Sequence, residues 1–282
     1  MSSYWLDFEF DFTLDAPTLL PYVAAIEACE PAVSFQIVPP EWREKSVAEV
    51  EADLRQTITA HKDPIENEIR IRKLALVLAN AGKAHKWAKE RFVPGSAPVC
   101  FEDILCIHRL VTEDAGTRSD TAGVMRKRGR QVITGSEQIG FHRGAPASML
   151  PRLMAEYLRF IHEKEWAGLP PIIHALLAHF FITTIHPFED GNGRVARLLS
   201  AGVLFQHGYK GHGLYAFSRY FYENEEQYQR ILFNASQHPR PDLTEFFAFG
   251  MKGLLLELQD QQFFEDEVGP RHDPRSIPSG MA

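Results

Sequence analysis

Apolar side chains recur every three to four residues along most of the chain, which is the period of helices that bury one face. The pattern first covers residues 16–30, and it returns at Val47, Val50, Leu54 and Ile58. The same period predicts further helices over 63–82, 100–114, 147–165, 170–185, 191–208, 225–237 and 242–267. The chain is therefore expected to be predominantly helical.

The helix that ends at Gly82 carries boundary signals of its own. Asp63 is placed to cap its N-terminus, and Pro64 stands in the first turn, where a missing amide costs little. Gly82 is placed to stop the helix.

The pattern changes between Gly123 and Pro146, where a basic run precedes β-branched residues with glycines at the turns. This change predicts a β-hairpin. We therefore expect an all-α bundle that carries one β-hairpin. Its parts are a partly helical N-terminal extension, a separate helix, a main helical domain and a tail, at residues 1–60, 61–82, 83–265 and 266–282. The tail is rich in proline, glycine and charge, which predicts disorder.

Composition narrows the class of protein. Of 282 residues, 45% are hydrophobic, which suffices for a sizeable core, and the net charge of -7 gives no general attraction to nucleic acids or anionic membranes. Three cysteines without metal or disulfide spacing fit a reducing compartment. The acidic N-terminus does not resemble a signal peptide, and no apolar run approaches the roughly 20 residues of a membrane span. We expect a soluble cytoplasmic protein with no membrane partner.

The segment 183–200, TTIHPFEDGNGRVARLLS, places many polar groups between apolar runs. Pro187 removes an amide and disfavours helix at His186, so one helix should end there. The next helix should begin near Gly191 or Asn192. Glycines on either side of the asparagine leave the backbone amides at that helix start accessible. These amides form a predicted anion-binding site.

Charged and titratable side chains surround this predicted anion site. Arg194 and Arg197 share one helix face, and arginine grips phosphate with a planar fork. Asp190 could hold a divalent cation that bridges phosphates, and His186 could take a proton from an attacking hydroxyl. The set suits transfer of a nucleotide phosphate to a hydroxyl. The alternative is an ordinary turn whose arginines pair with acids.

The residues HPFEDGNGR, 186–194, resemble the signature of Fic-domain proteins at every fixed position, and Arg197 supplies the second arginine found downstream. The apolar helix before the motif and the segment 214–232 after it resemble the family's flanking segments. The resemblance covers roughly residues 60–260.

The resemblance implies an all-α fold and transfer of AMP from ATP, with Mg²⁺, to a Ser, Thr or Tyr hydroxyl of a target protein. It makes His186 the general base and Asp190 the metal ligand, and Arg197 would bind the γ-phosphate. Nucleotide binding would fall to Gly191, Asn192, Gly193, Arg194 and Arg197. Doc-type kinases carry Lys where this chain has Gly193, which argues against that activity, whereas transfer of UMP or phosphocholine stays open.

The hairpin stands where the family carries a flap that aligns a target segment by adding a strand to it. The resemblance places this flap at Val132, Ile133, Thr134, Gly135 and Ile139.

A second segment, KDPIENE at 62–68, resembles the inhibitory motif of many Fic proteins, although Lys62 replaces the usual Ser or Thr. Glu66 and Asn67 occupy its Glu-Asn positions. In the family this glutamate pairs with the second arginine, here Arg197, and keeps the γ-phosphate from docking productively. Residues 61–82 would then be an inhibitory helix and 83–265 the catalytic domain. The alternative is a surface glutamate on an amphipathic helix.

Other polar residues receive structural interpretations. The run RKRGR, 126–130, is interpreted as a solvated hairpin edge, with steering of an acidic target as an alternative. Nucleic-acid binding is disfavoured because no groove-reading helix is recognisable. Four other histidines are interpreted as helix-packing residues, namely His108, His162, His174 and His179.

Tyr220 and Phe221 are assigned to the core, with stacking on adenine as an alternative. A rival enzyme would chiefly remove AMP, and a rival from another class would bind nucleotide as a signal without turnover. His186 argues against the latter, because binding alone needs no base. The target protein is not identifiable from the sequence, and a homodimer stays open.

Overall fold

The computed structural model describes residues 3–5, 7–29, 46–57, 64–115, 121–127, 132–162, 169–209 and 220–268. This part of the chain is mostly helical and contains one two-stranded antiparallel sheet, which confirms the predicted fold class. None of its helices is both long and apolar enough to cross a lipid bilayer.

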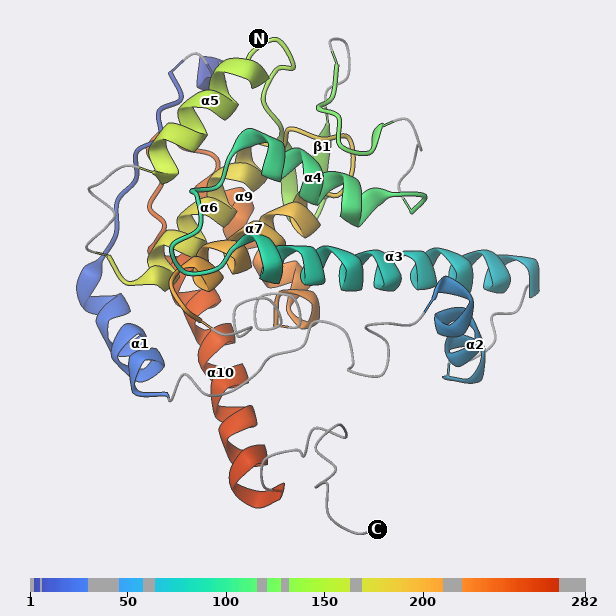
Figure 1. Ribbon diagram of the computed structural model, residues 1–282. Helices are drawn as coiled ribbons and strands as arrows, with labels where there is room; N and C mark the ends of the chain where they lie inside the picture. The colour runs from blue at the N-terminus through green and yellow to red at the C-terminus, as the bar shows by residue number, and fades with distance from the viewer. Residues whose placement is uncertain are drawn as a thin grey trace.

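All of the helices predicted from the apolar period are present (Figure 1). In chain order, after a 3-10 turn η1 (Ser3–Trp5), they are α1 (Ala16–Ala28), α2 (Val47–Thr57), α3 (Pro64–Arg91), α4 (Phe101–Thr112), α5 (Leu150–Ile161), α6 (Pro171–Ile185), α7 (Asn192–Gln206), α9 (Glu225–Ala235) and α10 (Thr244–Val268). The predicted hairpin consists of β1 (Ile133–Ser136) and β2 (Gly140–Arg143).

Helix α3 continues past Gly82 to Arg91, so the predicted stop at Gly82 is wrong. One glycine costs a helix only about 1 kcal/mol relative to alanine. Beyond it, Ala84 and Ala88 are buried in the core, and this packing outweighs the local preference. The boundary expected between an inhibitory helix and a catalytic domain therefore lies inside one continuous helix.

Two other predicted boundaries fall near the limits of the description. Asp63, the expected cap of α3, lies outside the described residues. Helix α10 includes 266–268, which had been assigned to the tail. The rest of that tail, 269–282, also lies outside them.

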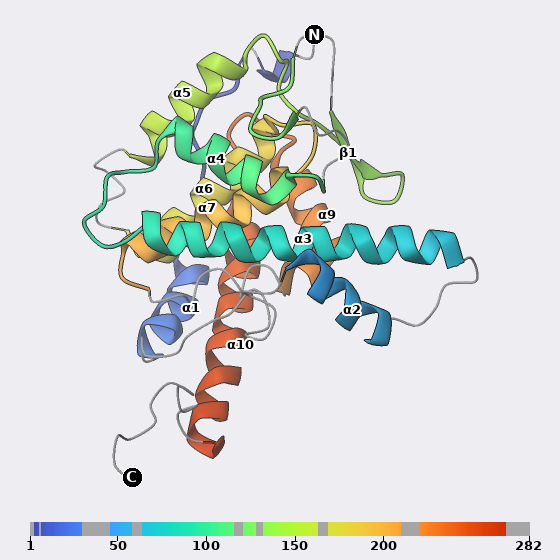
Figure 2. The same ribbon diagram turned by 45° about the vertical axis from the view of Figure 1, so that its right-hand side comes forward.

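The core is built around α6, in which every residue from Ala175 to Ile185 is buried. A helix that is apolar on all sides requires neighbours on all sides. Helix α7 packs along it, and α5 and α10 contact it from other directions (Figures 1 and 2). The C-terminus of α6 is therefore rigidly placed, which matters because His186 follows it.

The N-terminal segment is part of this core. Phe8 and Phe10 contact Phe181 of α6, with ring centroids 6.3 and 5.3 Å apart. Thr13 then forms a parallel bridge with Asp242, just before α10. These contacts give the first part of the N-terminal extension a structural role that the sequence did not reveal.

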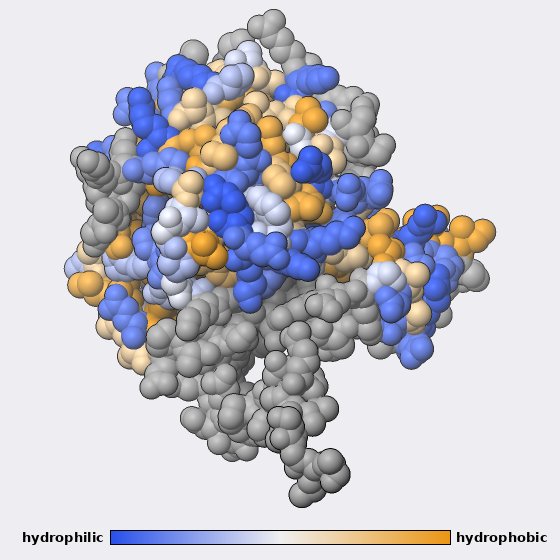
Figure 3. All heavy atoms as spheres, in the orientation of Figure 1, coloured by the Kyte–Doolittle hydropathy of each residue, from blue (hydrophilic) through white to orange (hydrophobic). Residues whose placement is uncertain are grey.

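Helix α2 and the first half of α3 form an arm with a small core of its own, made of Val50, Leu54, Ile71 and Ala75. Both ribbon views show this arm projecting from the bundle (Figures 1 and 2). Hydrophobic residues gather at its tip (Figure 3), where Ile65 and Ile69 are 73% and 64% exposed.

Candidate active site

His186 follows the last residue of α6 and has a left-handed backbone, with φ 54° and ψ 61°. A non-glycine residue in this region costs on the order of 1–3 kcal/mol, and such strain persists only where neighbours hold it. The sequence predicted that Pro187 would end the helix here, and the structure confirms that end. The left-handed turn was not predicted, because the residue before proline usually becomes extended.

The imidazole of His186 has a defined tautomer. Its Nδ1 lies 3.2 Å from the carbonyl oxygen of Thr183. A carbonyl only accepts hydrogen bonds, so Nδ1 carries the proton and Nε2 keeps its lone pair. That arrangement leaves Nε2 as the ring nitrogen able to accept a proton.

The surroundings of His186 keep this side chain neutral. Burial lowers the pKa of His186 to about 3, and the nearby His142 ring and Arg126 guanidinium act in the same direction. The Thr183 carbonyl and Asp190 act in the opposite direction, but burial has the largest effect. His186 is therefore in its base form throughout the neutral pH range.

Helix α7 begins at Asn192, as predicted, and its N-cap Gly191 has φ 80°. A Cβ on Gly191 would lie 2.6 Å from Cγ2 of Thr112, so both conformation and space require glycine. No side chain caps this helix start. The amides of its first turn are therefore available to an anion.

Asn192 has a different role from the one expected. Its side chain is buried, accepts a hydrogen bond from the Phe188 amide and donates one to the Phe188 carbonyl, both at 3.0 Å. It therefore braces the His186–Gly191 loop, and only its backbone amide remains for phosphate.

The two arginines of α7 differ in their partners. Arg194 forms an ion pair of 3.1 Å with Asp190 and donates to the carbonyl of Val111. Within the described part of the chain, no carboxylate forms an ion pair with Arg197, and one of its terminal nitrogens would lie 3.4 Å from a Cβ on Gly193. Among the described residues, the site thus holds a guanidinium without a direct ion pair beside uncapped helix amides, which is an arrangement that attracts phosphate.

Asp190 suits the magnesium ion that was predicted. One of its oxygens accepts the Gly191 amide at 2.6 Å and the other pairs with Arg194, while the side chain stays 39% exposed. No group of three potential metal ligands occurs among the described residues. Mg²⁺ is commonly held by one or two carboxylates together with substrate phosphates, so a single carboxylate beside the anion site fits it.

His108 of α4 supports the loop from behind, a role that no pattern in the sequence indicates. Its Nδ1 accepts the Gly123 amide at 2.8 Å, so Nε2 carries a proton that it donates to the Asp190 carbonyl at 3.0 Å. The ring also stacks on Phe188 with centroids 3.8 Å apart. Burial lowers the pKa of His108 to about 4, which keeps it neutral. A lone histidine on a helix is indistinguishable from a packing residue until its partners are known.

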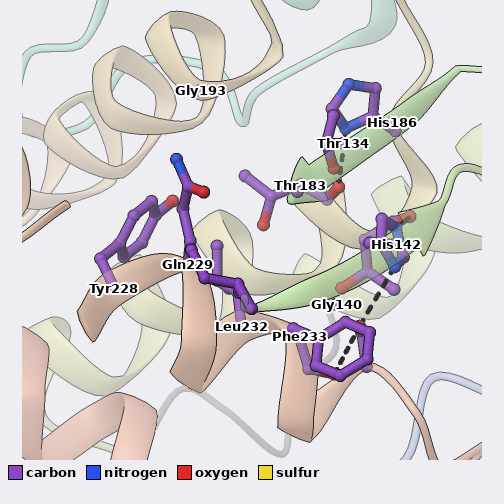
Figure 4. A pocket seen from close by; sticks show the side chains of 14 residues that line it. Thr134, Gly140, His142, Thr183, His186, Gly193, Tyr228, Gln229, Leu232 and Phe233 are labelled. Atoms are coloured by element: carbon purple, nitrogen blue, oxygen red, sulfur yellow. Dashed lines mark hydrogen bonds between the residues drawn. The ribbon is translucent and has the colours of Figure 1, made fainter. Parts of the chain in front are cut away.

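A pocket opens between the hairpin, the end of α6 and the start of α7, and α9 closes it (Figure 4). His186 and Gly193 line one end, and Leu232 and Phe233 form an apolar wall. Gln229 supplies a polar group between them.

The predicted flap residues Thr134, Gly135 and Ile139 line this pocket. Ile133 is 48% exposed on β1, and Val132 precedes that strand. The hairpin thus brings one end of a strand to the same opening as His186.

Tyr220 and Phe221 lie outside this pocket. Phe221 is 2% exposed and stacks on Tyr228, while Tyr220 packs on Phe249. Their assignment to the core is confirmed, and stacking on adenine is not supported.

His179 was interpreted as a packing residue and is fully buried in α6, where its Nε2 lies 2.7 Å from the Tyr228 hydroxyl. Arg126 was interpreted as part of a solvated basic edge, which is wrong, because it is only 4% exposed. Its guanidinium donates to backbone carbonyls of the site. Lys127 is exposed, as expected, and 128–130 lie outside the described residues.

The structure does not bring Glu66 to Arg197. Asn80 of α3 donates to the carbonyl of Glu113, directly after α4, and Arg194 reaches Val111 in the last turn of α4. The arginines therefore lie near the middle of α3. Glu66, with its neighbour Asn67, stands fourteen residues before Asn80, which is about 21 Å along a continuous helix. In this arrangement Glu66 cannot occupy the Arg197 guanidinium.

The geometry defines a helical bundle in which a neutral histidine and an uncapped helix start line the same pocket. Residues 98–204, which contain both groups, match the model of the Fic/DOC family. The chain thus contains a Fic/DOC family domain.

Curated relatives match over a similar region. Protein adenylyltransferase fic-1 of Caenorhabditis briggsae is 32% identical over 111 residues, which cover 39% of this chain and 20% of that protein. Protein adenylyltransferase Fic of Drosophila sechellia is 32% identical over 143 residues, covering 51% of this chain and 25% of that protein. The chain spans a quarter or less of the length of these relatives.

Solved structures agree on the fold. A Fic family protein from Desulfovibrio desulfuricans aligns with a TM-score of 0.63 at 20% identity, covering 93% of this chain and 78% of that one. A Fic domain-containing signaling protein from Bacteroides thetaiotaomicron gives a TM-score of 0.54 at 18% identity, covering 91% and 92%.

Proposed function

We propose that this chain is a protein adenylyltransferase, which moves AMP from ATP to a hydroxyl of a target protein. One observation carries the proposal: His186, whose Nε2 can accept a proton, and Gly193 in the uncapped first turn of α7 line a single pocket, and a terminal nitrogen of Arg197 would lie 3.4 Å from a Cβ on Gly193. The curated names of relatives at 32% identity support the same reaction.

In this mechanism the hydroxyl oxygen of the target attacks the α-phosphorus of ATP, and Nε2 of His186 accepts the hydroxyl proton. The bond from the α-phosphorus to the oxygen bridging to the β-phosphorus breaks, and pyrophosphate leaves. Arg194, Arg197 and the α7 amides stabilise the charge on the departing phosphates. When bound at Asp190, Mg²⁺ would neutralise further negative charge on the phosphate oxygens.

The residues that line the pocket suggest where the nucleobase and the target segment would bind. The apolar wall of Leu232 and Phe233 suits the flat face of a nucleobase, and Gln229 offers it a hydrogen-bonding amide. The target segment would lie along β1, because the exposed edge of a two-stranded sheet can accept another strand.

Inhibition of AMP transfer by Glu66 is part of this proposal only if α3 adopts a second conformation. Helix α3 would have to bend between Glu66 and Asn80 so that its first turns return to α7. A carboxylate bidentate to Arg197 would then compete with the γ-phosphate for the same guanidinium.

The test is incubation of wild type and Glu66→Gly with Mg²⁺ and ATP labelled at either the α- or the γ-phosphate. Retention of α-label on protein, with no γ-label, is the expected result. Retention of γ-label would indicate a kinase instead. Absence of label from both positions in both proteins would reject the transferase, and AMP removal or nucleotide sensing would replace it.

A further inference from the structure

Arg126 contacts three consecutive residues at the end of α6. Its Nε donates to the His186 carbonyl at 2.7 Å, and its Nη2 donates to the Ile185 carbonyl at 3.4 Å. Its backbone amide donates to the Pro187 carbonyl at 3.0 Å. Nη2 also donates to the carbonyl of Ala145. This buried guanidinium is therefore directed at the backbone that carries the base.

These contacts provide hydrogen-bond donors to backbone carbonyls at the end of α6. The last carbonyls of a helix have no intrahelical partners, and a cation near them is favourable. At the end of α6 the need is greater, because Pro187 has no amide to offer and His186 is left-handed. Arg126 supplies donors that the backbone of α6 itself cannot supply.

The segment after β2 adds further contacts to this backbone. Together, Arg126, Gly144 and Ala145 form a clamp on residues 185–187. The Ala145 amide donates to the Ile185 carbonyl at 3.0 Å. A Cβ on Gly144 would lie 2.8 Å from Cβ of His186 and 3.0 Å from Nη2 of Arg126. Glycine at position 144 therefore leaves the room in which the guanidinium and the His186 backbone meet.

We propose that Arg126 is a positioning residue that holds His186 in its left-handed conformation, with Gly144 providing the space. The proposal rests on the proposed function. Arg126 is buried against backbone carbonyls, so it acts on the reaction through His186 and not by contact with the substrate. Lysine is a poor substitute, because a single ammonium cannot reproduce the fixed fork of donors.

The charge of Arg126 acts together with its hydrogen bonds. The groups that face His186 are His142 of β2, Arg126, Asp190 and the Thr183 carbonyl. Burial has the largest effect on the pKa of His186, and His142 and then Arg126 lower it further. The same side chain thus holds the imidazole in place and disfavours its protonated form.

The experiment compares Arg126→Met and Arg126→Lys with a control, Lys127→Met, which changes the exposed neighbour. Label transfer gives kcat, and a fluorescent ATP analogue gives Kd. For Arg126→Met we expect kcat to fall about 100-fold, the effect of misplacing a reacting group by roughly 1 Å, with Kd changed less than threefold. Arg126→Lys should recover part of kcat, and Lys127→Met should match wild type. A kcat for Arg126→Met within threefold of wild type, or a proportional loss of ATP binding, would overturn the proposal.

A second variant and a second readout separate this proposal from the proposed function. Gly144→Ala keeps the Arg126 side chain and should produce the same loss of kcat, which also covers the case that Arg126→Met does not fold. The imidazole NMR signal of His186, assigned by its absence in His186→Ala, should move in Gly144→Ala and stay in place in Lys127→Met. That signal reports on the clamp even where no label is transferred. An unmoved His186 signal in Gly144→Ala would overturn the positioning role and leave the transferase untouched.

Discussion

His186 combines a strained backbone with a defined tautomer, and both follow from contacts to neighbouring carbonyls. The Thr183 carbonyl fixes the proton on Nδ1, so the lone pair of Nε2 is available without any rearrangement. A base that is already oriented lowers the barrier through placement as well as through proton affinity.

Replacing His186 by alanine should reduce label transfer by roughly 100- to 10,000-fold, which is the usual contribution of a general base. ATP binding should persist, because phosphate contacts come from α7. The measurement is kcat from α-labelled ATP beside a binding titration. His238→Ala removes an exposed histidine and should change neither quantity. Full turnover by His186→Ala would refute the role of general base.

At the scale of elements, the start of α7 depends on two glycines for different reasons. Gly191 has a positive φ and no space for a Cβ, whereas Gly193 is helical and has a 3.4 Å contact at its nearest. A substitution at Gly191 is therefore expected to affect folding, whereas one at Gly193 is expected to affect phosphate binding.

Gly191→Ala should lower the free energy of unfolding by about 2 kcal/mol or more, from backbone strain and the clash with Thr112. Gly193→Ala should stay within about 0.5 kcal/mol of wild type, because alanine is favoured over glycine in a helix. Urea denaturation of the two variants measures both values. Equal stability of the two variants would contradict the conformation assigned to Gly191.

The continuity of α3 determines what Glu66 can do. Glu66→Gly should raise self-labelling above wild type, because the bent arrangement of α3 would lose its carboxylate for Arg197. Glu68→Gly is the matched control, since Glu68 pairs with Arg55 in the arm. Equal labelling by Glu66→Gly and wild type would remove Glu66 from the mechanism and leave the extended α3 as the working form.

The sequence predicted those elements whose signals are local. Pro187 and Gly191 mark the end of α6 and the start of α7, and both boundaries are confirmed. Long-range partners carry no such signal. Arg126 meets His186 60 residues along the chain, and His108 meets Asp190 82 residues along it. Their roles follow from the tertiary fold and could not be inferred from spacing.

At the scale of the whole molecule, buried neutral histidines make stability depend on pH. Burial lowers the pKa of His179 and His186 to about 3 and that of His108 to about 4. The unfolded chain, with a histidine pKa near 6.5, takes up these protons first as the pH falls. The stabilisation is therefore complete above pH 6.5 and declines progressively towards the folded pKa values.

Denaturation at pH 7, 6 and 5 should show the free energy of unfolding falling below pH 6.5, by up to about 1.4 kcal/mol per pH unit for each such histidine. His179→Gln should reduce that slope by the contribution of one histidine, up to about 1.4 kcal/mol per pH unit. A stability that is constant from pH 7 to pH 5 would contradict the buried neutral state of these side chains.

The bridge between Thr13 and Asp242 has a consequence for synthesis on the ribosome. Phe8 and Phe10 are translated well before their partner Phe181 and the strand-like contact at Asp242. At bacterial or eukaryotic elongation rates of about 5–20 residues per second, the delay is roughly 10–45 seconds. Throughout that interval the nascent chain presents a cluster of aromatic rings with nothing to cover them, which is the kind of surface that chaperones bind.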